Sequence, residues 1–335
     1  MSRGNPEAGA VLAPPPPAGL RRLTRPPTFS VVIPAYQAAA TIATAVRSAL
    51  DQVVRAHEVI VVDDGSTDDL EGALREFEGS IDVVHKPNGG AASARNAGIT
   101  AASGDFMAVL DADDRFHPHR LEALSELAQQ RPDLDLLTTD TRFIVGGEDA
   151  GSFLVENPFA VEDQRTAILG SCFVGGWPAA RLDRLREIGG FDESLRVGHD
   201  WDCWVRLVLD GSRAGLVNLP YYDYVVDSGG LTAGRVRSLW DRVGLLEKAS
   251  RNPALRAGER PVLERELRRR RDEAVRAEIG QAGSGDRRRL LGLSTRPGLP
   301  PRTRLLAVLA AVAPLRARQL AGEHGSPEER LAGDR

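Results

Sequence analysis

The 335-residue sequence contains only two cysteines, Cys172 and Cys203, and only two lysines. The two cysteines provide neither a disulfide framework nor the spacing of a zinc site, which fits a reducing compartment. No apolar run approaches the roughly 20 residues that a membrane span requires, and the longest candidate, residues 305–315, contains Pro314. The formal net charge of −4 argues against a dedicated nucleic-acid-binding protein. We therefore expect a cytoplasmic protein.

The chain has enough apolar residues, 42%, to bury a sizeable core. Residues 1–28 carry a proline run and no long apolar core, so they are predicted to be a disordered tail and not a signal peptide. Residues 29–235 are predicted to form one α/β domain and residues 236–322 an Arg-rich helical extension. Residues 323–335 are polar and are predicted to be disordered.

Short apolar strands alternate with helical patterns in the first half of the predicted domain. The strands are expected at 29–33, 58–64, 81–85, 105–110 and 134–139. The intervening helices are expected at 41–52, 66–77, 89–103 and 118–130. This alternation predicts βαβ units and a Rossmann-like, mainly parallel sheet flanked by helices. Residues 221–235, with paired glycines and aromatics, are predicted to be a flexible loop.

Polar clusters follow the first four predicted strands, where ligands bind in parallel sheets. They read "PAY", "DDGS", "NGG" and "DADD" in chain order. In the last cluster, Asp111 and Asp113 form an Asp-x-Asp pair at a strand end. Hard cations prefer carboxylate oxygens, and Mg²⁺ is often held by one or two carboxylates plus substrate phosphates. The alternative is an acidic turn that caps the following helix.

Four segments together resemble the family 2 glycosyltransferases of the GT-A fold. They are "VVIPAYQAAATIATAVRSAL", "EVIVVDDGSTD", "NGGAASARNAGITAASGDFMAVLDADD" and "EIGGFDESLRVGHDWDCWVRL", which occur in the family's order between about Ser30 and Thr232. The resemblance implies transfer of a sugar from a nucleotide-diphosphate sugar to an acceptor hydroxyl, with inversion at the anomeric carbon. It also implies a glycan or lipid-linked acceptor in surface-glycan or cell-wall synthesis.

The resemblance assigns donor-binding roles to residues at the strand ends. Pro34, Ala35 and Tyr36 match the segment along the base and ribose, although Tyr36 could instead be a core aromatic. Asp64 matches the residue that contacts the base edge. Arg95 could meet a phosphate or pair with an aspartate of the acidic cluster.

The resemblance implies a divalent cation, Mn²⁺ or Mg²⁺. Asp111 matches the position near the ribose and metal, and Asp113 matches the direct metal ligand. Asp114 is expected to support them or to cap a helix. Asp227 stands where many relatives carry a basic stretch with a histidine, so it is a further candidate ligand.

The second half of the domain must supply a base for the acceptor hydroxyl. Asp200, in "GHDWD", matches the family's base, and His199 replaces the glutamate that usually precedes it. Asp200 could instead be an ordinary acidic residue of a first helical turn. Trp177 and Trp201 could form an acceptor platform, or they could be buried core residues.

Other functional classes fit less well. A sugar-phosphate nucleotidyltransferase should carry a Gly-rich basic loop after the first strand, but residues 34–41 read "PAYQAAAT". No G-x-G-x-x-G follows that strand, which disfavours a dehydrogenase. The Gln-x-x-Arg-Trp motif of processive synthases is absent after residue 200, which favours transfer of one sugar at a time. An inactive relative that scaffolds a glycan-assembly complex stays open.

Residues 302–320 are apolar with arginine at both ends. The segment could lie on a membrane surface near a lipid-linked acceptor. The alternative is a short helix packed on the domain or on another subunit.

Overall fold

The structure, a computed structural model, describes residues 9–20, 23–226, 235–281, 286–296 and 298–312. By its internal contacts the chain divides into two compact units. The first spans Met1–Gly230 together with Asn252–Leu255, and the second spans Leu231–Arg251 and Arg256–Arg335. The division therefore falls a few residues before the predicted boundary at residue 235.

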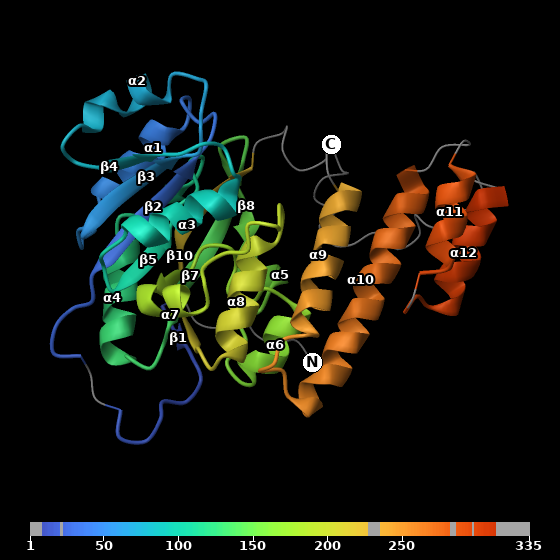
Figure 1. The fold of residues 1–335 in the computed structure, drawn as a ribbon. Helices are drawn as coiled ribbons and strands as arrows, with labels where there is room; N and C mark the ends of the chain where they lie inside the picture. The colour runs from blue at the N-terminus through green and yellow to red at the C-terminus, as the bar shows by residue number, and fades with distance from the viewer. Residues whose placement is uncertain (1–8, 21–22, 227–234, 282–285, 297, 313–335) are drawn as a thin grey trace. The chain divides into compact units, whose positions relative to one another are not determined.

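Four parallel strands form one half of the sheet in the first unit (Figure 1). Their order is β4-β3-β2-β5, and the pairs β2–β3, β2–β5 and β3–β4 are all parallel. Their bounds are β2 Phe29–Ala35, β3 Glu58–Asp63, β4 Asp82–His85 and β5 Phe106–Val109. The helices between them are α1 Ile42–Leu50, α2 Leu70–Leu74, the 3₁₀ turn η1 Arg75–Phe77 and α3 Ala91–Ala101. The four carboxyl ends therefore lie along one edge of the sheet.

The other half of the sheet is mixed. Strand β9 (Ala179–Arg181) runs antiparallel between β5 and β7 (Leu136–Val145), and β10 (Ala214–Val226) runs parallel to β7. Three short strands pair antiparallel: β1 Val11–Leu12 and β6 Arg115–Phe116 with β10, and β8 Glu148–Ser152 with β7. The predicted α/β architecture is confirmed, although β9 introduces antiparallel pairing into the sheet.

The remaining helices complete the two units. In the first unit they are α4 Arg120–Gln130, α5 Phe153–Glu156, α6 Gln164–Gly170, α7 Leu182–Glu187 and α8 His199–Leu209. In the second unit they are α9 Arg235–Ala249, the 3₁₀ turn η2 Ala257–Glu259, α10 Arg260–Gln281, α11 Arg287–Ser294 and α12 Pro301–Val312. Within the described part of the chain, no helix combines the length and hydropathy needed to cross a bilayer.

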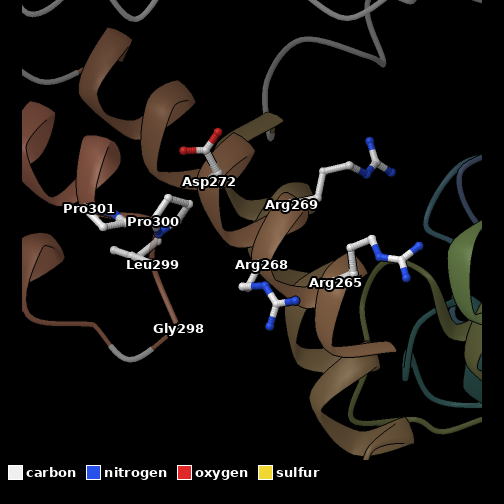
Figure 2. A pocket seen from close by; sticks show the side chains of 8 residues that line it. All are labelled: Arg265, Arg268, Arg269, Asp272, Gly298, Leu299, Pro300 and Pro301. Carbon is white, nitrogen blue, oxygen red and sulfur yellow. The ribbon is translucent and has the colours of Figure 1, made fainter. Parts of the chain in front are cut away.

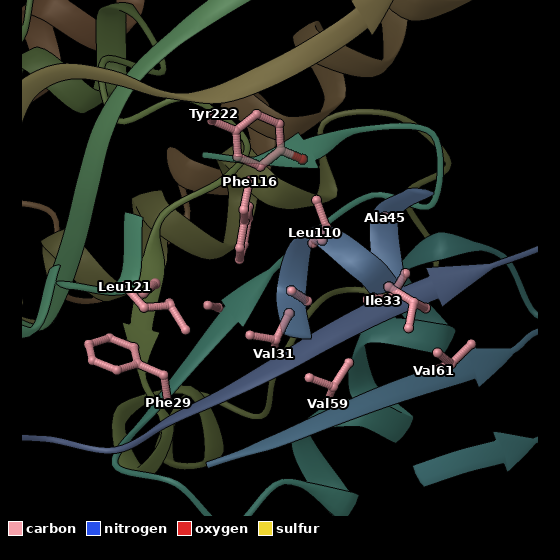
Figure 3. Close-up of a cluster of buried hydrophobic side chains, with 14 of the residues drawn as sticks. Phe29, Val31, Ile33, Ala45, Val59, Val61, Leu110, Phe116, Leu121 and Tyr222 are labelled. Atoms are coloured by element: carbon pink, nitrogen blue, oxygen red, sulfur yellow. The ribbon is translucent and has the colours of Figure 1, made fainter. Parts of the chain in front are cut away.

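Strand β2 is packed tightly on both faces, and this packing holds its carboxyl end in place. Strand β2 is apolar on both faces, as expected for a central parallel strand. Val31 and Ile33 lie in one buried cluster with Ala45 of α1 (Figure 3). On the opposite face, a β-carbon added at Gly98 of α3 would lie 2.3 Å from Val32 Cγ1. Helix α3 therefore packs closely against β2, and this contact tolerates no side chain at Gly98.

Two predictions of irregular structure are wrong. Residues 9–20 were expected in a disordered tail, but β1 pairs with β10, and the Gly9 N–H donates to Asn218 O at 2.9 Å. The Arg131 guanidinium also donates to Pro14 O at 2.7 Å. Residues 221–226 were expected in a flexible loop, but they continue β10. In both places, pairing within the sheet through β10 satisfies backbone groups that the sequence pattern could not assign.

Candidate functional site

The first strand end presents an exposed aromatic ring. Strand β2 ends with Pro34 and Ala35, and Tyr36 follows with 54% of its surface exposed. Its neighbour Gln37 has a φ of 53° and accepts hydrogen bonds from the Thr67 backbone N–H at 2.7 Å. Tyr36 is thus not a core residue, and its ring is accessible beside the loop that follows β3.

The two aspartates after β3 are both engaged by the chain. Asp63 accepts from the Ser66 backbone N–H at 2.8 Å, so it holds this loop. Asp64 is buried and accepts from the N–H groups of Gly89 and Gly90 at 2.9 and 2.7 Å. The Lys86 ammonium also pairs with it. The Asp64 carboxylate therefore joins β3 to the start of α3. The contact of Asp64 with the nucleotide base, which the resemblance implies, stays a prediction.

Arg95 links residues that are far apart in the sequence. Its side chain is buried in α3, where Nη2 donates to Asp111 Oδ1 at 2.7 Å and Nη1 lies 2.7 Å from His199 Nε2. Although burial opposes the charge, Asp111 and Asp200 raise the pKa of Arg95. Burial and the Arg95 cation lower the pKa of His199, so the neutral imidazole accepts from Arg95. Of the two alternatives for Arg95, the structure shows pairing with an aspartate.

Asp114 is the buried carboxylate of residues 111–114, which we call the acidic loop, and residues of β10 hold it. It is 1% exposed and accepts from the Tyr222 hydroxyl at 2.7 Å and from the Val225 N–H at 2.8 Å. The Tyr222 hydroxyl in turn accepts from the Asp111 N–H at 3.3 Å. Burial, and then the Asp111 carboxylate, raise the pKa of Asp114 to about 8. Strand β10 thereby fixes the acidic loop in place.

The acidic loop fits a divalent cation. Within the described ranges, no group of three or more His, Cys, Asp and Glu side chains forms a metal site by itself. Two carboxylates plus phosphate oxygens are nevertheless a usual donor set for Mg²⁺. Asp113 is exposed beside Asp111, so both carboxylates could reach a cation in the open part of the site. Asp227, the other candidate ligand, lies outside the described residues.

Asp200 lies in the first turn of α8, next to a glycine loop. Its Oδ1 accepts from the Trp201 N–H at 2.8 Å. A β-carbon added at Gly176 would lie 2.9 Å from Asp200 Oδ2. Asp202, by contrast, is buried and pairs with Arg206 at 2.7 Å. Of the two acidic residues at this helix start, Asp200 is the one that lies near Arg95.

Arg95 connects the predicted donor side to the predicted acceptor side. It pairs with Asp111 and contacts His199, the residue before Asp200 in α8. Burial raises the pKa of Tyr224 to about 12, and Asp114, Asp111, Asp113 and Asp200 raise it further. The donor-side and acceptor-side aspartates therefore lie on either side of Arg95.

The two candidate platform tryptophans differ. The ring centroid of Trp177 lies 5.2 Å from that of Tyr222 and 5.1 Å from that of Tyr224, so Trp177 lies beside the carboxylates and is half-buried. Trp201 is 6% exposed, and its indole N–H donates to Ile168 O at 2.7 Å. The prediction of Trp201 as a sugar platform is wrong, because its ring is part of the core.

A match to a known family covers the part of this site that precedes α8. Residues 30–188 match the family model described as glycosyl transferase family 2. Over these residues the chain is similar to the family 2 glycosyltransferases. It is 34% identical over 227 residues to the succinoglycan biosynthesis protein ExoU of Rhizobium meliloti, covering 62% of this chain and 64% of that protein. The chain spans less than two-thirds of the length of the curated relatives it matches.

Two solved structures share the fold. The structure of S. aureus TarS 1-349 in complex with UDP-GlcNAc superposes with a TM-score of 0.65 at 17% identity, covering 88% of this chain and 90% of that chain. The mannosyltransferase PcManGT of Pyrobaculum calidifontis, in complex with GDP-Man and Mn²⁺, superposes with a TM-score of 0.58 at 20% identity. That alignment covers 94% of this chain and 81% of the other.

Several residues of this site were not predicted from the sequence. Tyr222 and Tyr224 lie in a segment predicted to be a loop, and His199 was treated only as a replacement for glutamate. Arg120 is fully buried in α4 and donates to Trp177 O at 2.6 Å. The alternating aromatics of "YYDYVV" were a usable strand signal, but no sequence spacing indicates the contacts of Arg120.

Proposed function

We propose that the chain transfers a sugar from a nucleotide-diphosphate sugar to an acceptor hydroxyl, with inversion, and that it works in the cytoplasm. The observation that carries the proposal is that Arg95 pairs with Asp111, after β5, and contacts His199, the neighbour of Asp200 in α8. A donor diphosphate needs charge neutralisation, and an acceptor hydroxyl needs a base. Asp200 offers the base, and a cation held by Asp111 and Asp113 would offer the neutralisation.

Asp200 is the proposed base. It accepts the proton of the attacking hydroxyl while the acceptor oxygen bonds to the anomeric carbon. The bond from that carbon to the diphosphate oxygen breaks on the opposite face, and the electron pair leaves with the diphosphate. Arg95 holds Asp111 in place, while Tyr222 and Val225 hold Asp114. Trp177 is the proposed platform for the acceptor sugar.

Asp111 and Asp113 are the proposed ligands of a divalent cation, which when bound would neutralise charge on the departing diphosphate. The similar structure of the mannosyltransferase PcManGT, which is in complex with GDP-Man and Mn²⁺, supports this choice. The relative named for succinoglycan biosynthesis supports a glycan or lipid-linked acceptor in surface-polysaccharide synthesis. Tyr36 is the proposed stacking partner of the base, because its ring is accessible at the end of β2.

Nucleotide binding tests the donor half of the proposal. We would titrate UDP, GDP and dTDP calorimetrically into the chain with Mn²⁺, with Mg²⁺ and with EDTA. One nucleotide should bind in a metal-dependent way, and Asp113→Asn should abolish that binding. Asp82→Asn, which changes an exposed acid on β4, is the matched control and should bind normally. A folded chain that binds no nucleotide would overturn the donor site.

Asp200→Asn tests the acceptor half. The variant should bind the nucleotide like the wild type and lose transfer by a factor of about 10² or more, as expected for loss of a general base. The assay would follow release of nucleoside diphosphate from the donor identified by calorimetry. A variant with unchanged turnover would remove Asp200 from the chemistry. Wild-type protein that binds nucleotide but never turns over would instead favour a scaffold.

A further inference from the structure

Helix α12 is apolar on two opposite faces. Its inner face packs into the core of the second unit through Leu306, Ala307, Ala310 and Ala311, together with Val275 and Ile279 of α10. Its outer face exposes Leu305, Val308 and Val312, whose exposed fractions are 70%, 40% and 72%. The spacing of three and four residues places these side chains in one stripe along the helix. We call Leu305, Val308 and Val312 the outer stripe of α12.

The outer stripe lies in the strongly basic part of the chain. Residues 231–312 contain 19 arginines and lysines against nine aspartates and glutamates, a net charge of +10, whereas the whole chain has −4. Arg302 and Arg304 are exposed at the start of α12, and the helical repeat places them on either side of the outer stripe. Such charge asymmetry between parts of one chain indicates an anionic partner.

The arginines near α12 are spread out and do not converge on one anion. A hollow of about 540 Å³ is lined by Arg265, Arg268, Arg269 and Asp272 of α10 and by residues 298–301, at the start of α12. The guanidinium groups of Arg265 and Arg269 point away from residues 298–301 (Figure 2). Divergent cations suit a broad anionic surface better than a single bound phosphate.

We propose that the outer stripe of α12 and its flanking arginines bind the surface of an anionic lipid membrane. Exposed aliphatic side chains enter the acyl boundary of a bilayer, and arginines beside them attract anionic headgroups. Nucleic acid would use the cations but would gain little from aliphatic side chains. A symmetric dimer through this face would bring two basic surfaces together, which is unfavourable.

Sedimentation with vesicles tests the proposal. Full-length protein should sediment with vesicles of phosphatidylglycerol and phosphatidylcholine, and should sediment far less with phosphatidylcholine alone or at high salt. The double variant Leu305→Ser/Val312→Ser should weaken partitioning by about tenfold or more. Arg302→Ser should weaken it by about fivefold. Val155→Ser, at a 68% exposed position of α5 in the other unit, is the matched control and should partition normally.

The readout is independent of the proposed sugar transfer, because nucleotide binding should be the same in all four proteins. Since the substituted side chains are exposed, the variants should also unfold at the same temperature as the wild type. Absence of wild-type sedimentation would overturn the proposal. So would equal partitioning of the double variant, which would mean that another surface binds or that other residues of the chain cover the stripe. Light scattering that shows a dimer broken by the double variant would replace the membrane with a second copy.

Discussion

Gly176 lies directly against the carboxylate of Asp200. A β-carbon at position 176 would approach Asp200 Oδ2 to 2.9 Å, closer than real β-carbons approach a neighbouring atom. Gly176 belongs to the loop before β9, and its neighbour Trp177 accepts a hydrogen bond from Arg120 through its carbonyl. The loop therefore packs directly against the side chain of Asp200, the proposed general base.

Gly176→Ala should misplace Asp200 without unfolding the protein. A shift of the carboxylate by a fraction of an ångström to about 1 Å should lower kcat by about 10- to 100-fold. Donor binding should be unchanged, because the substitution does not touch Asp111 or Asp113. Gly170→Ala is the matched control, since a β-carbon there meets nothing within 4 Å. Steady-state kinetics on both variants would decide, and equal kcat values would show that this wall does not position the base.

Arg95→Gln should destabilise the first unit. The substitution removes a buried cation and leaves the Asp111 carboxylate and the His199 ring without their shared partner. We expect a loss of about 3 kcal/mol in the free energy of unfolding. Arg47→Gln is the comparison, because the exposed pair of Arg47 with Glu76 should contribute at most about 1 kcal/mol. Urea unfolding of both variants measures the difference, and similar losses would contradict a structural role for Arg95.

Arg120→Met should affect turnover more than stability. The buried guanidinium donates to Thr139 Oγ1 and to Trp177 O, and it lies between the rings of Phe116 and Tyr222 at 4.8 and 4.9 Å. Burial lowers the pKa of Arg120 to about 10, so the protein bears a desolvation cost that methionine removes. This gain should offset most of the lost hydrogen bonding, which leaves a net change within about 2 kcal/mol.

The larger consequence of Arg120→Met should be on kcat, because the loop beside Asp200 loses its tether. We expect a decrease of about tenfold with little change in the dissociation constant of the nucleotide. Thermal unfolding, nucleotide titration and turnover would be measured on the same preparation. A variant with weakened nucleotide binding and unchanged kcat would contradict this account of the loop.

Asp105 should make the protein sensitive to acid. A hydrogen bond from Arg25 lowers the pKa of Asp105 to about 2, against the effect of burial and with help from Thr28. Because the folded-state pKa is below the unfolded value, the contribution is full above about pH 4 and is lost as the pH falls through about 2. After allowance for solvent screening we expect about 1 kcal/mol.

Asp105→Asn measures this contribution directly. Above about pH 5 the variant should be less stable than the wild type, and the difference should disappear between about pH 4 and about pH 2. Asp82→Asn, on an exposed strand position, should show no such pH dependence. A stability difference that stays constant down to about pH 2 would show that Asp105 acts through its shape and not through its charge.

The sequence determined the parallel half of the sheet and the polar residues at the carboxyl ends of its strands. Short apolar runs located β2, β3, β4 and β5 to within two residues. Since parallel strands end at one edge, the order of strands and helices along the chain was enough to place the clusters around Asp64 and Asp111 together. The family motif then added Asp200, which lies in the same site.

Tertiary structure alone decided which partners these side chains have. Arg95 meets His199 across 104 positions, and Tyr222 meets Asp114 across 108. Such contacts depend on the antiparallel insertion of β9 and the course of β10, which no local pattern encodes. The same holds for Trp201, whose burial depends on the elements packed around α8. Local sequence fixes periodicity and motif, whereas the satisfaction of buried polar groups is settled only when distant segments pack together.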